Sequence, residues 1–219
     1  MFDSSIFSML WVGLLETLYM TLVSTLAAYL IGLPLGVFMV VSDKNGILPM
    51  PTLNSVLGVI INIVRSVPFL ILLVAVIPFT RWVVGTTIGS TATIVPLVIA
   101  AAPFIARLVE SSLKEVDSGV IEAAQSMGAT PLTIICRVMI PEAKPALIVN
   151  GAIAITTILS YSAMAGFVGG GGLGSIATNY GYYRFQNDIM LITVVMLVIV
   201  VQVFQEAGMR LARRVDKRN

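Results

Sequence analysis

Five long apolar segments follow one another along the chain, separated by shorter polar stretches. They cover approximately Leu14–Val41, Val56–Phe79, Ile88–Val109, Ala146–Val168 and Ile189–Ala207. Each segment is long enough to cross a bilayer core of about 30 Å, which takes roughly 20 apolar helical residues. Backbone groups in lipid must form hydrogen bonds within their own helix, and the alternation of a β-barrel strand is absent. The pattern predicts an all-α integral membrane protein with five transmembrane helices, in a single domain over residues 1–219.

Composition supports the same class of protein. Apolar residues make up 58% of the chain and charged residues only 11%, and the mean hydropathy is +0.99. A water-soluble domain has about a quarter charged residues. The chain has no His and a single Cys, Cys136, so it lacks the commonest metal ligand and general base and forms no intrachain disulfide. We therefore expect no catalytic residue, no metal site and no nucleic acid partner.

The distribution of positive charge orients the predicted helices. With the N-terminus outside, the cytoplasmic segments are 42–55, 110–145 and 208–219. These segments and the flanking end of the third helix contain Lys44, Arg107, Lys114, Arg137, Lys144, Arg210, Arg213, Arg214, Lys217 and Arg218. The outer segments contain only Arg81 and Arg184. Because cytoplasmic loops are enriched in Lys and Arg, the sequence predicts the N-terminus outside and the C-terminus inside.

The cytoplasmic segment at about 110–145, between the third and fourth predicted spans, has the local pattern of two short helices. Capping and helix-ending residues follow in the order Asp117 or Ser118, Gly128, Thr130, Pro131, Pro141 and Pro145. A side-chain oxygen caps the start of each helix, a left-handed glycine ends the first, and Pro131 suits the first position of the second. Pro141 and Pro145 are expected to end that second helix.

Small residues in this segment predict a narrow ridge that fits a groove on another protein. They are Ala123, Ala124, Gly128 and Ala129. A surface connector with well-capped helices is the alternative interpretation. The order Glu122-Ala123-Ala124, three residues, Gly128, and then Val138-x-Ile140-Pro141 resembles the EAA loop of ABC importer permeases. That family has Ile-x-Leu-Pro at the last position. The resemblance implies a loop that docks on a separate ATPase through Glu122, Ala123, Ala124, Gly128, Ala129 and Pro141.

The resemblance extends over nearly the whole chain. The runs Glu16–Leu22, Val64–Leu70, Ala101–Glu110, Tyr161–Met164 and Gly169–Gly174 are similar to those of methionine-uptake ABC permeases. Membership implies a homodimer in the lipid bilayer of the bacterial cytoplasmic membrane, two copies of a cytoplasmic ATPase and an external substrate-binding lipoprotein. The implied substrate is methionine, both L and D, with another amino acid or a small peptide as the alternative.

The sequence contains no Gly-x4-Gly-Lys-Ser/Thr motif, which is the phosphate-binding loop of many ATPases. We therefore expect no cofactor on this chain, with ATP and Mg bound by the partner ATPase. An intramembrane enzyme is disfavoured because no metal site or base-activated nucleophile can be assembled. An ion-coupled secondary carrier is disfavoured because such proteins use acids inside their spans, and none is expected well inside a span here. Glu16 is interpreted as an interfacial acid near the outer end of the first span.

Arg65 lies inside the second predicted helix, followed by Ser66 and, two residues later, by Pro68. A charge inside a span is costly and usually faces protein or water, and Pro68 is expected to kink the helix. One hypothesis places these three residues on the translocation path or in contacts beside it. In the alternative, the helix starts later and Arg65 reaches the cytoplasmic headgroups. The sequence favours a structural role or this reach to the headgroups over direct substrate contact.

The end of the fourth predicted span contains a candidate gate formed by Tyr161, Ser162 and Met164. Met is long and adaptable and can close a narrow apolar constriction, and the small neighbours allow close helix approach. Ordinary helix packing is the alternative. The outer segment 169–188 is rich in Gly and Tyr. Its aromatic residues are interpreted first as interfacial anchors and second as a docking surface for the binding protein.

Overall fold

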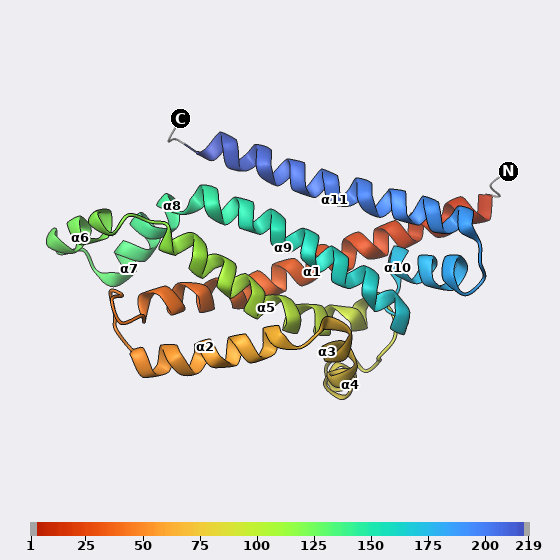
Figure 1. The fold of residues 1–219 in the computed structure, drawn as a ribbon, viewed down its shortest axis with the longest axis horizontal. Coiled ribbons are helices and arrows are strands. Elements are labelled where there is room, and N and C mark those ends of the chain that lie inside the picture. The colour runs from red at the N-terminus through yellow and green to blue at the C-terminus, as the bar shows by residue number, and fades with distance from the viewer. Residues whose placement is uncertain (1–3, 217–219) are drawn as a thin grey trace. The chain divides into compact units, whose positions relative to one another are not determined.

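The computed structural model describes residues 4–216, and all regular elements in that range are helical (Figure 1). The four longest helices are α1 (Ser4–Val41), α5 (Ser90–Lys114), α9 (Lys144–Ala165) and α11 (Asn187–Val215). The shorter ones are α2 (Pro51–Ser66), α3 (Phe69–Ala75), α4 (Ile77–Val84), α6 (Ser118–Ser126), α7 (Pro131–Ile134), η1 (Ile135–Met139), α8 (Ile140–Glu142), η2 (Gly166–Val168), α10 (Gly172–Ile176) and η3 (Ala177–Tyr182). The predicted all-α class is confirmed.

Within residues 4–216, four helical segments are long and apolar enough to cross a membrane. They are α1, α5, α11, and α9 together with the short helices that follow it as far as Tyr182. A fifth span exists only if the bent pair α2 and α3 is counted as one broken span. The expectation of one helix over Val56–Phe79, kinked at Pro68, is therefore wrong, because two separate helices meet there. Pro68 occupies the N-cap position of α3 and has no N–H to continue α2, so one helix ends at Ser66 and another begins at Phe69.

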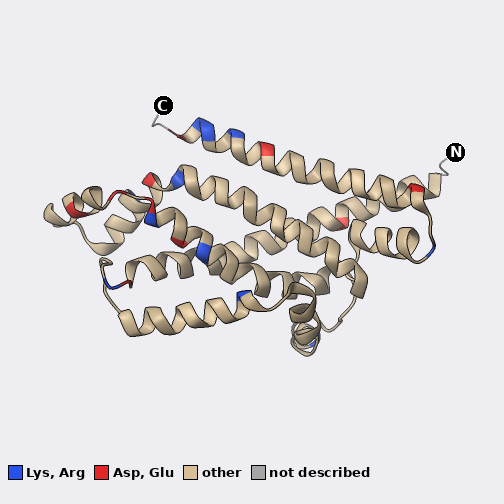
Figure 2. Ribbon diagram, viewed as in Figure 1, with Lys and Arg blue, Asp and Glu red and all other residues tan. Residues whose placement is uncertain are grey.

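Contacts divide the described chain into two compact units. The first comprises α1 up to Ala27, Val67–Ala101 and Ile155–Gln205, and the second comprises the remainder. Each of the four longest helices contributes to both units. Among the described charged residues, the first unit contains only Glu16, Arg81, Arg184 and Asp188. Figure 2 shows the long uncharged stretches of α1 and α9 that result.

In the second unit, α1 packs closely against α5 through two glycines four residues apart. A Cβ added at Gly32 would lie 2.7 Å from the carbonyl oxygen of Ala102, and one at Gly36 would lie 2.6 Å from the Cβ of Val109. Helices in lipid associate through such small residues because the absence of a side chain allows close backbone approach. The Gly-x-x-x-Gly spacing of these two residues is a recognised signal of helix packing and is already visible in the sequence.

In the first unit, the buried core joins α1, α10 and α11 through Leu10, Leu173, Ile176 and Ile189. Leu173 is completely buried. A Cβ at Gly13 would clash with the side chain of Ile176, so α10 lies directly on the surface of α1. This short helix is therefore an integral part of the unit, although its sequence predicts a glycine-rich loop.

Candidate functional site

The first short helix in the segment between α5 and α9 forms as its sequence predicts. Asp117 is the N-cap of α6, and its carboxylate accepts a hydrogen bond from the N–H of Gly119 at 2.6 Å. Gly128 adopts φ +76°, a left-handed conformation that favours glycine and ends a helix without strain. The predicted capping of α6 is confirmed.

The second short helix starts as predicted and ends differently. Thr130 is its N-cap, with its hydroxyl 3.4 Å from the N–H of Thr133, and Pro131 follows as the first helical residue. The expectation that Pro141 ends this helix is wrong. The helix passes through a π-helical turn, η1, directly into α8, so Pro141 lies within a continuous helical run from Pro131 to Glu142. The helical run ends at Glu142, two residues before α9 begins at Lys144.

The surface of α6 and α7 is more apolar than the predicted ridge of small residues. Glu122 and Ala123 are exposed, but Ala124 is buried with only 5% of its surface accessible. Large apolar side chains are exposed instead, with Val120 at 45%, Met127 at 82% and Leu132 at 70%. Figure 1 shows these two helices beside each other. Exposed apolar side chains between polar residues are typical of a surface that binds a protein partner.

A charged network ties α5 to α2 in the second unit. The guanidinium of Arg107 donates to Glu110 at 2.6 Å and, through its second terminal nitrogen, to the carbonyl of Gly58 and the amide oxygen of Asn62, both at 3.1 Å. Lys114 donates to the other oxygen of Glu110 at 2.8 Å. Glu110 is only 8% exposed, so its charge is balanced by two cations on its own helix. The sequence predictions did not include this network, although the spacing of residues 107, 110 and 114 places them on one helix face.

The predicted path residues near the helix break lie in different environments. Arg65 is exposed in the last turn of α2 and makes no hydrogen bond or ion pair within residues 4–216. Ser66 donates to the carbonyl of Asn62 at 2.8 Å. The second helix does not start later than expected, because α2 begins at Pro51, and the reach of Arg65 to the headgroups stays a prediction. Pro68 belongs with α3 in the first unit.

The break at Pro68 places an aromatic ring on the candidate gate. Phe69, the first residue of α3, stacks on Tyr161 of α9 with ring centroids 4.6 Å apart and an angle of 4° between the rings. Ser162 is 1% exposed and donates to the carbonyl of Leu159 at 2.7 Å, whereas Met164 is 44% exposed. The structure therefore brings Pro68 and Tyr161 together through Phe69. It leaves Met164 as an accessible apolar side chain near the end of α9.

Glu16 contacts the backbone of another helix, and its interpretation as an interfacial acid stays a prediction. Helix α1 begins at Ser4, so Glu16 lies about three turns inside it. Its carboxylate accepts a hydrogen bond from the N–H of Gly172 at 2.7 Å. The neighbouring Thr17 hydroxyl accepts one from the N–H of Leu173 at 2.8 Å. That no acid lies well inside a span stays a prediction, and Glu16 is in addition the hydrogen-bond acceptor for the start of α10.

The segment 169–188 is largely helical in place of the expected loop. Helices α10 and η3 occupy Gly172–Tyr182. The guanidinium of Arg184 lies 4.6 Å from the ring centroid of Tyr180, within the range of a cation–π contact. Tyr182, Tyr183 and Phe185 are more than half exposed. These exposed rings are compatible with both predicted roles, interfacial anchoring and protein docking.

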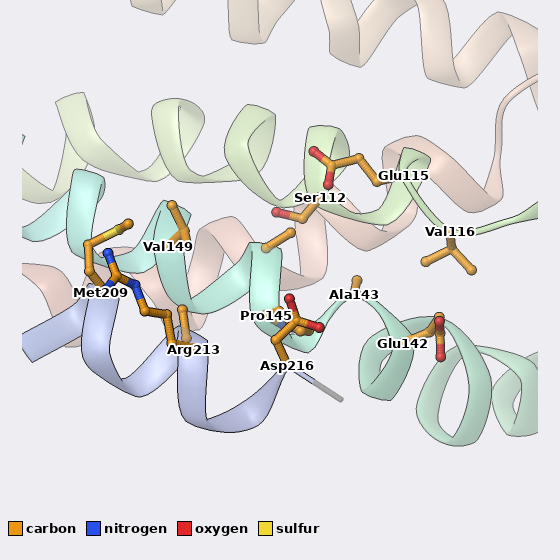
Figure 3. Close-up of a pocket in the computed structure, with 12 residues that line it drawn as sticks. Ser112, Glu115, Val116, Glu142, Ala143, Pro145, Val149, Met209, Arg213 and Asp216 are labelled. Carbon is orange, nitrogen blue, oxygen red and sulfur yellow. The ribbon is translucent and has the colours of Figure 1, made fainter. Parts of the chain in front are cut away.

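A pocket of about 300 Å³ lies in the second unit, where α5, α9 and α11 converge (Figure 3). Its charged lining residues are Glu115, Glu142, Arg213 and Asp216. The pocket is lined by residues at both ends of the segment that contains α6 to α8, Val116 at one end and Glu142 at the other. Movement of that segment would therefore change the shape of the pocket. Within residues 4–216, no group of three or more acids or Cys is close enough to hold a metal ion.

Comparison with known proteins identifies the family. A family model described as "Binding-protein-dependent transport system inner membrane component" matches residues 32–219. The probable D-methionine transport system permease protein MetI of Vibrio cholerae is 54% identical over 203 residues, covering 93% of this chain and 90% of that protein. The D-methionine transport system permease protein MetI of Escherichia coli K12 is 49% identical over 161 residues, covering 72% and 74% respectively.

Solved structures agree with these relatives. A chain from the MetNI methionine ABC transporter in an inward-facing conformation is similar with a TM-score of 0.97 and 46% identity, covering 99% of this chain and 100% of that one. A chain of an amino acid ABC transporter has a TM-score of 0.77 at 22% identity, which demonstrates a shared fold alone. The apolar helices, the family model and these relatives lead to one conclusion: this chain is a multi-pass inner-membrane protein that belongs to the family of binding-protein-dependent transport system inner membrane components.

Proposed function

We propose that this chain is the permease subunit of an ATP-driven ABC importer that moves methionine, in both L and D forms, across the cytoplasmic membrane. The observation that supports this most strongly is the similarity, over nearly the full length of both chains, to a chain of the MetNI methionine ABC transporter. Relatives described as D-methionine permeases support the same substrate. Another amino acid or a small peptide is the second candidate substrate class.

The proposed orientation has the N-terminus outside and the C-terminus in the cytoplasm. Most of the described Lys and Arg residues belong to the second unit, which also contains α6 to α8 and the end of α11. A cytoplasmic location of that unit follows from the enrichment of positive charge on the inner side. Helices α6 and α7 would then face an ATPase with their exposed side chains Val120, Met127 and Leu132.

We propose a complex of two copies of this chain, two copies of a cytoplasmic ATPase and an external substrate-binding lipoprotein. ATP and Mg bind to the ATPase, and this chain contributes no catalytic group. Closure of the two ATPases on ATP would draw the segments at about 110–145 together and favour the outward-open state. A ligand drives such a change only through its different affinity for the two states, and here that ligand is ATP.

The proposed translocation path includes the residues beside the helix break and the candidate gate. Met164 would close the path from its accessible position near the end of α9, with Tyr161 held by Phe69 and Ser162 buried beside it. Arg65, Ser66 and Pro68 mark the break between α2 and α3. At such a break, backbone groups that lack helical partners are stable in a membrane only when they contact protein or water.

The test is uptake of radiolabelled L-methionine into proteoliposomes that contain this chain, its ATPase and its binding protein. We expect uptake that requires internal ATP, competition by unlabelled D-methionine, and little competition by other amino acids or dipeptides. Stronger competition by one of those compounds would assign a different substrate to the same transporter. Uptake by this chain alone, driven by an ion gradient and independent of ATP, would contradict the proposal and indicate a secondary carrier.

A further inference from the structure

We infer that Glu16 is a positioning residue for the candidate gate: from α1, its carboxylate holds the start of α10, and α10 in turn fixes the backbone on both sides of Met164. This inference rests on the proposed function, because it assumes that Met164 closes the path. All the contacts involved lie within the first unit.

The backbone N–H groups at the start of α10 find their hydrogen-bond acceptors on α1. Gly171, the residue before this helix, has no side chain to cap it. The N–H of Gly172 donates to Glu16, and the N–H of Leu173 donates to Thr17. These are the unpaired donors at a helix start, and here their acceptors come from another helix. A carboxylate is the favoured acceptor because the N-terminal end of a helix has a positive partial charge.

The approach of α10 to α1 is too close for side chains at its first residue. Gly171 and Gly172 adopt φ +83° and +71°, conformations that glycine alone adopts readily. A Cβ at Gly172 would lie 2.6 Å from the hydroxyl oxygen of Thr17 and 2.9 Å from the terminal methyl carbon of Met20. The start of α10 is therefore held against α1 by hydrogen bonds and by direct packing.

At its other side, α10 packs directly on the backbone around the candidate gate residue Met164. A Cβ at Gly174 would clash with the backbone of Ala163, and a Cβ at Gly166 would clash with the backbone of Gly174 and Ser175. The hydroxyl of Ser175 also lies 3.4 Å from the carbonyl oxygen of Gly166. Backbone thus packs on backbone one residue before and two residues after Met164, without flexible side chains between them.

The hydrogen bond from α10 to Glu16 and the backbone packing of α10 on α9 together connect Glu16 to Met164 through rigid contacts. Closely packed backbones transmit a displacement because no side chain can change rotamer to absorb it. Loss of the Glu16 acceptor would free the N–H of Gly172 and loosen α10 against α1. The backbone at Ala163 and Gly166 would then lose its fixed position, and the closed state of the gate would become less populated.

The experiment measures ATP hydrolysis by the reconstituted transporter in the absence of binding protein and substrate. We expect E16A to raise this basal rate per assembled complex by about threefold to tenfold, the factor that loss of one hydrogen bond of ordinary net strength produces. E16Q should remain close to the unchanged protein, because its amide oxygen still accepts from Gly172. E206A is the matched control, since the carboxylate of Glu206 bonds to the exposed side chain of Arg210 on its own helix.

Combination with M164A separates the inference from the proposed function. If M164A raises the basal rate and E16A adds nothing to it, Glu16 acts through the gate. If M164A raises the rate and E16A alone does not, or if their effects multiply, the positioning role is overturned and the gate stands. If M164A has no effect, the gate is wrong and the inference fails with it.

If E16A prevents assembly, T17V replaces it in the experiment. This variant removes the acceptor of the Leu173 N–H, and the same rise in basal ATP hydrolysis is expected.

Discussion

The rings of Phe69 and Tyr161 lie parallel with their centroids 4.6 Å apart, joining the first residue after the Pro68 break to the candidate gate. Phe69 is 7% exposed. A stacked aromatic pair adds to the stability that burial alone provides. The position of Tyr161 is therefore linked to the position at which α3 begins.

Replacement of Tyr161 tests this stack. Y161A should lower the stability of the purified complex by about 1–3 kcal/mol, because the stacking and part of the burial of Phe69 are lost. Y161F should have little effect, because the stack uses the ring and not the hydroxyl. Thermal unfolding in detergent measures the difference. Equal destabilisation by both variants would show that the hydroxyl, and not the stack, is the important group.

Close packing of α1 on α5 predicts an intolerance to side chains at Gly36. G36V should reduce the yield of folded protein severely, because its Cβ would lie 2.5 Å from the carbonyl oxygen of Ala106 and 2.6 Å from Val109. G58A is the matched control in α2, where a Cβ would find no neighbour closer than 3.4 Å. Size-exclusion profiles of the two variants after extraction from membranes provide the comparison, and a normal profile for G36V would refute the packing.

The network around Arg107 predicts a clear contrast between two ion pairs. R107A should destabilise the protein by about 1–3 kcal/mol, because it removes one cation from a nearly buried carboxylate and leaves Gly58 and Asn62 without their donor. R210A breaks an exposed pair, with side-chain exposures of 72% and 58%, and should cost about 0–1 kcal/mol. Denaturant or thermal unfolding of both variants measures the contrast. Similar losses would mean that burial of Glu110 does not strengthen its pairing.

The caps of α6 predict effects on ATPase binding without effects on membrane insertion. D117A removes the acceptor for Gly119 and should cost about 1 kcal/mol of local helix stability. G128V forces a β-branched residue into a left-handed conformation at a cost of about 1–3 kcal/mol.

Both variants should insert normally and co-purify less ATPase than the unchanged chain, whereas D117N keeps the cap and should co-purify it normally. The readout is the ratio of ATPase to permease after affinity purification. Full ATPase recovery with both G128V and D117A would argue against docking through α6 and α7.

The sequence predicted local features well because their causes are local. Apolar segment length indicated which parts cross the bilayer. The starts and the end of the short helices were predicted correctly at Asp117, Thr130 and Gly128, because each of these residues acts on backbone groups only a few residues away. Pro68 was expected to disturb the second span because a missing N–H acts on its own helix. Pro141 was misjudged because the helical run continues through it, with a π-helical turn at Ile135–Met139 immediately before.

Partners distant in the sequence were decided only by the tertiary structure. Glu16 is 156 residues from Gly172, and nothing in the residues around Glu16 distinguishes an interfacial acid from a carboxylate that caps a remote helix. Likewise, Gly169–Gly174 suggests a flexible loop when taken alone, yet much of this run is the start of α10, packed on α1 and α9. Helix formation and membrane insertion depend on the chemistry of one segment. The choice of acceptor for a backbone N–H depends on which other segment comes within about 3 Å of it, and only the folded arrangement determines that.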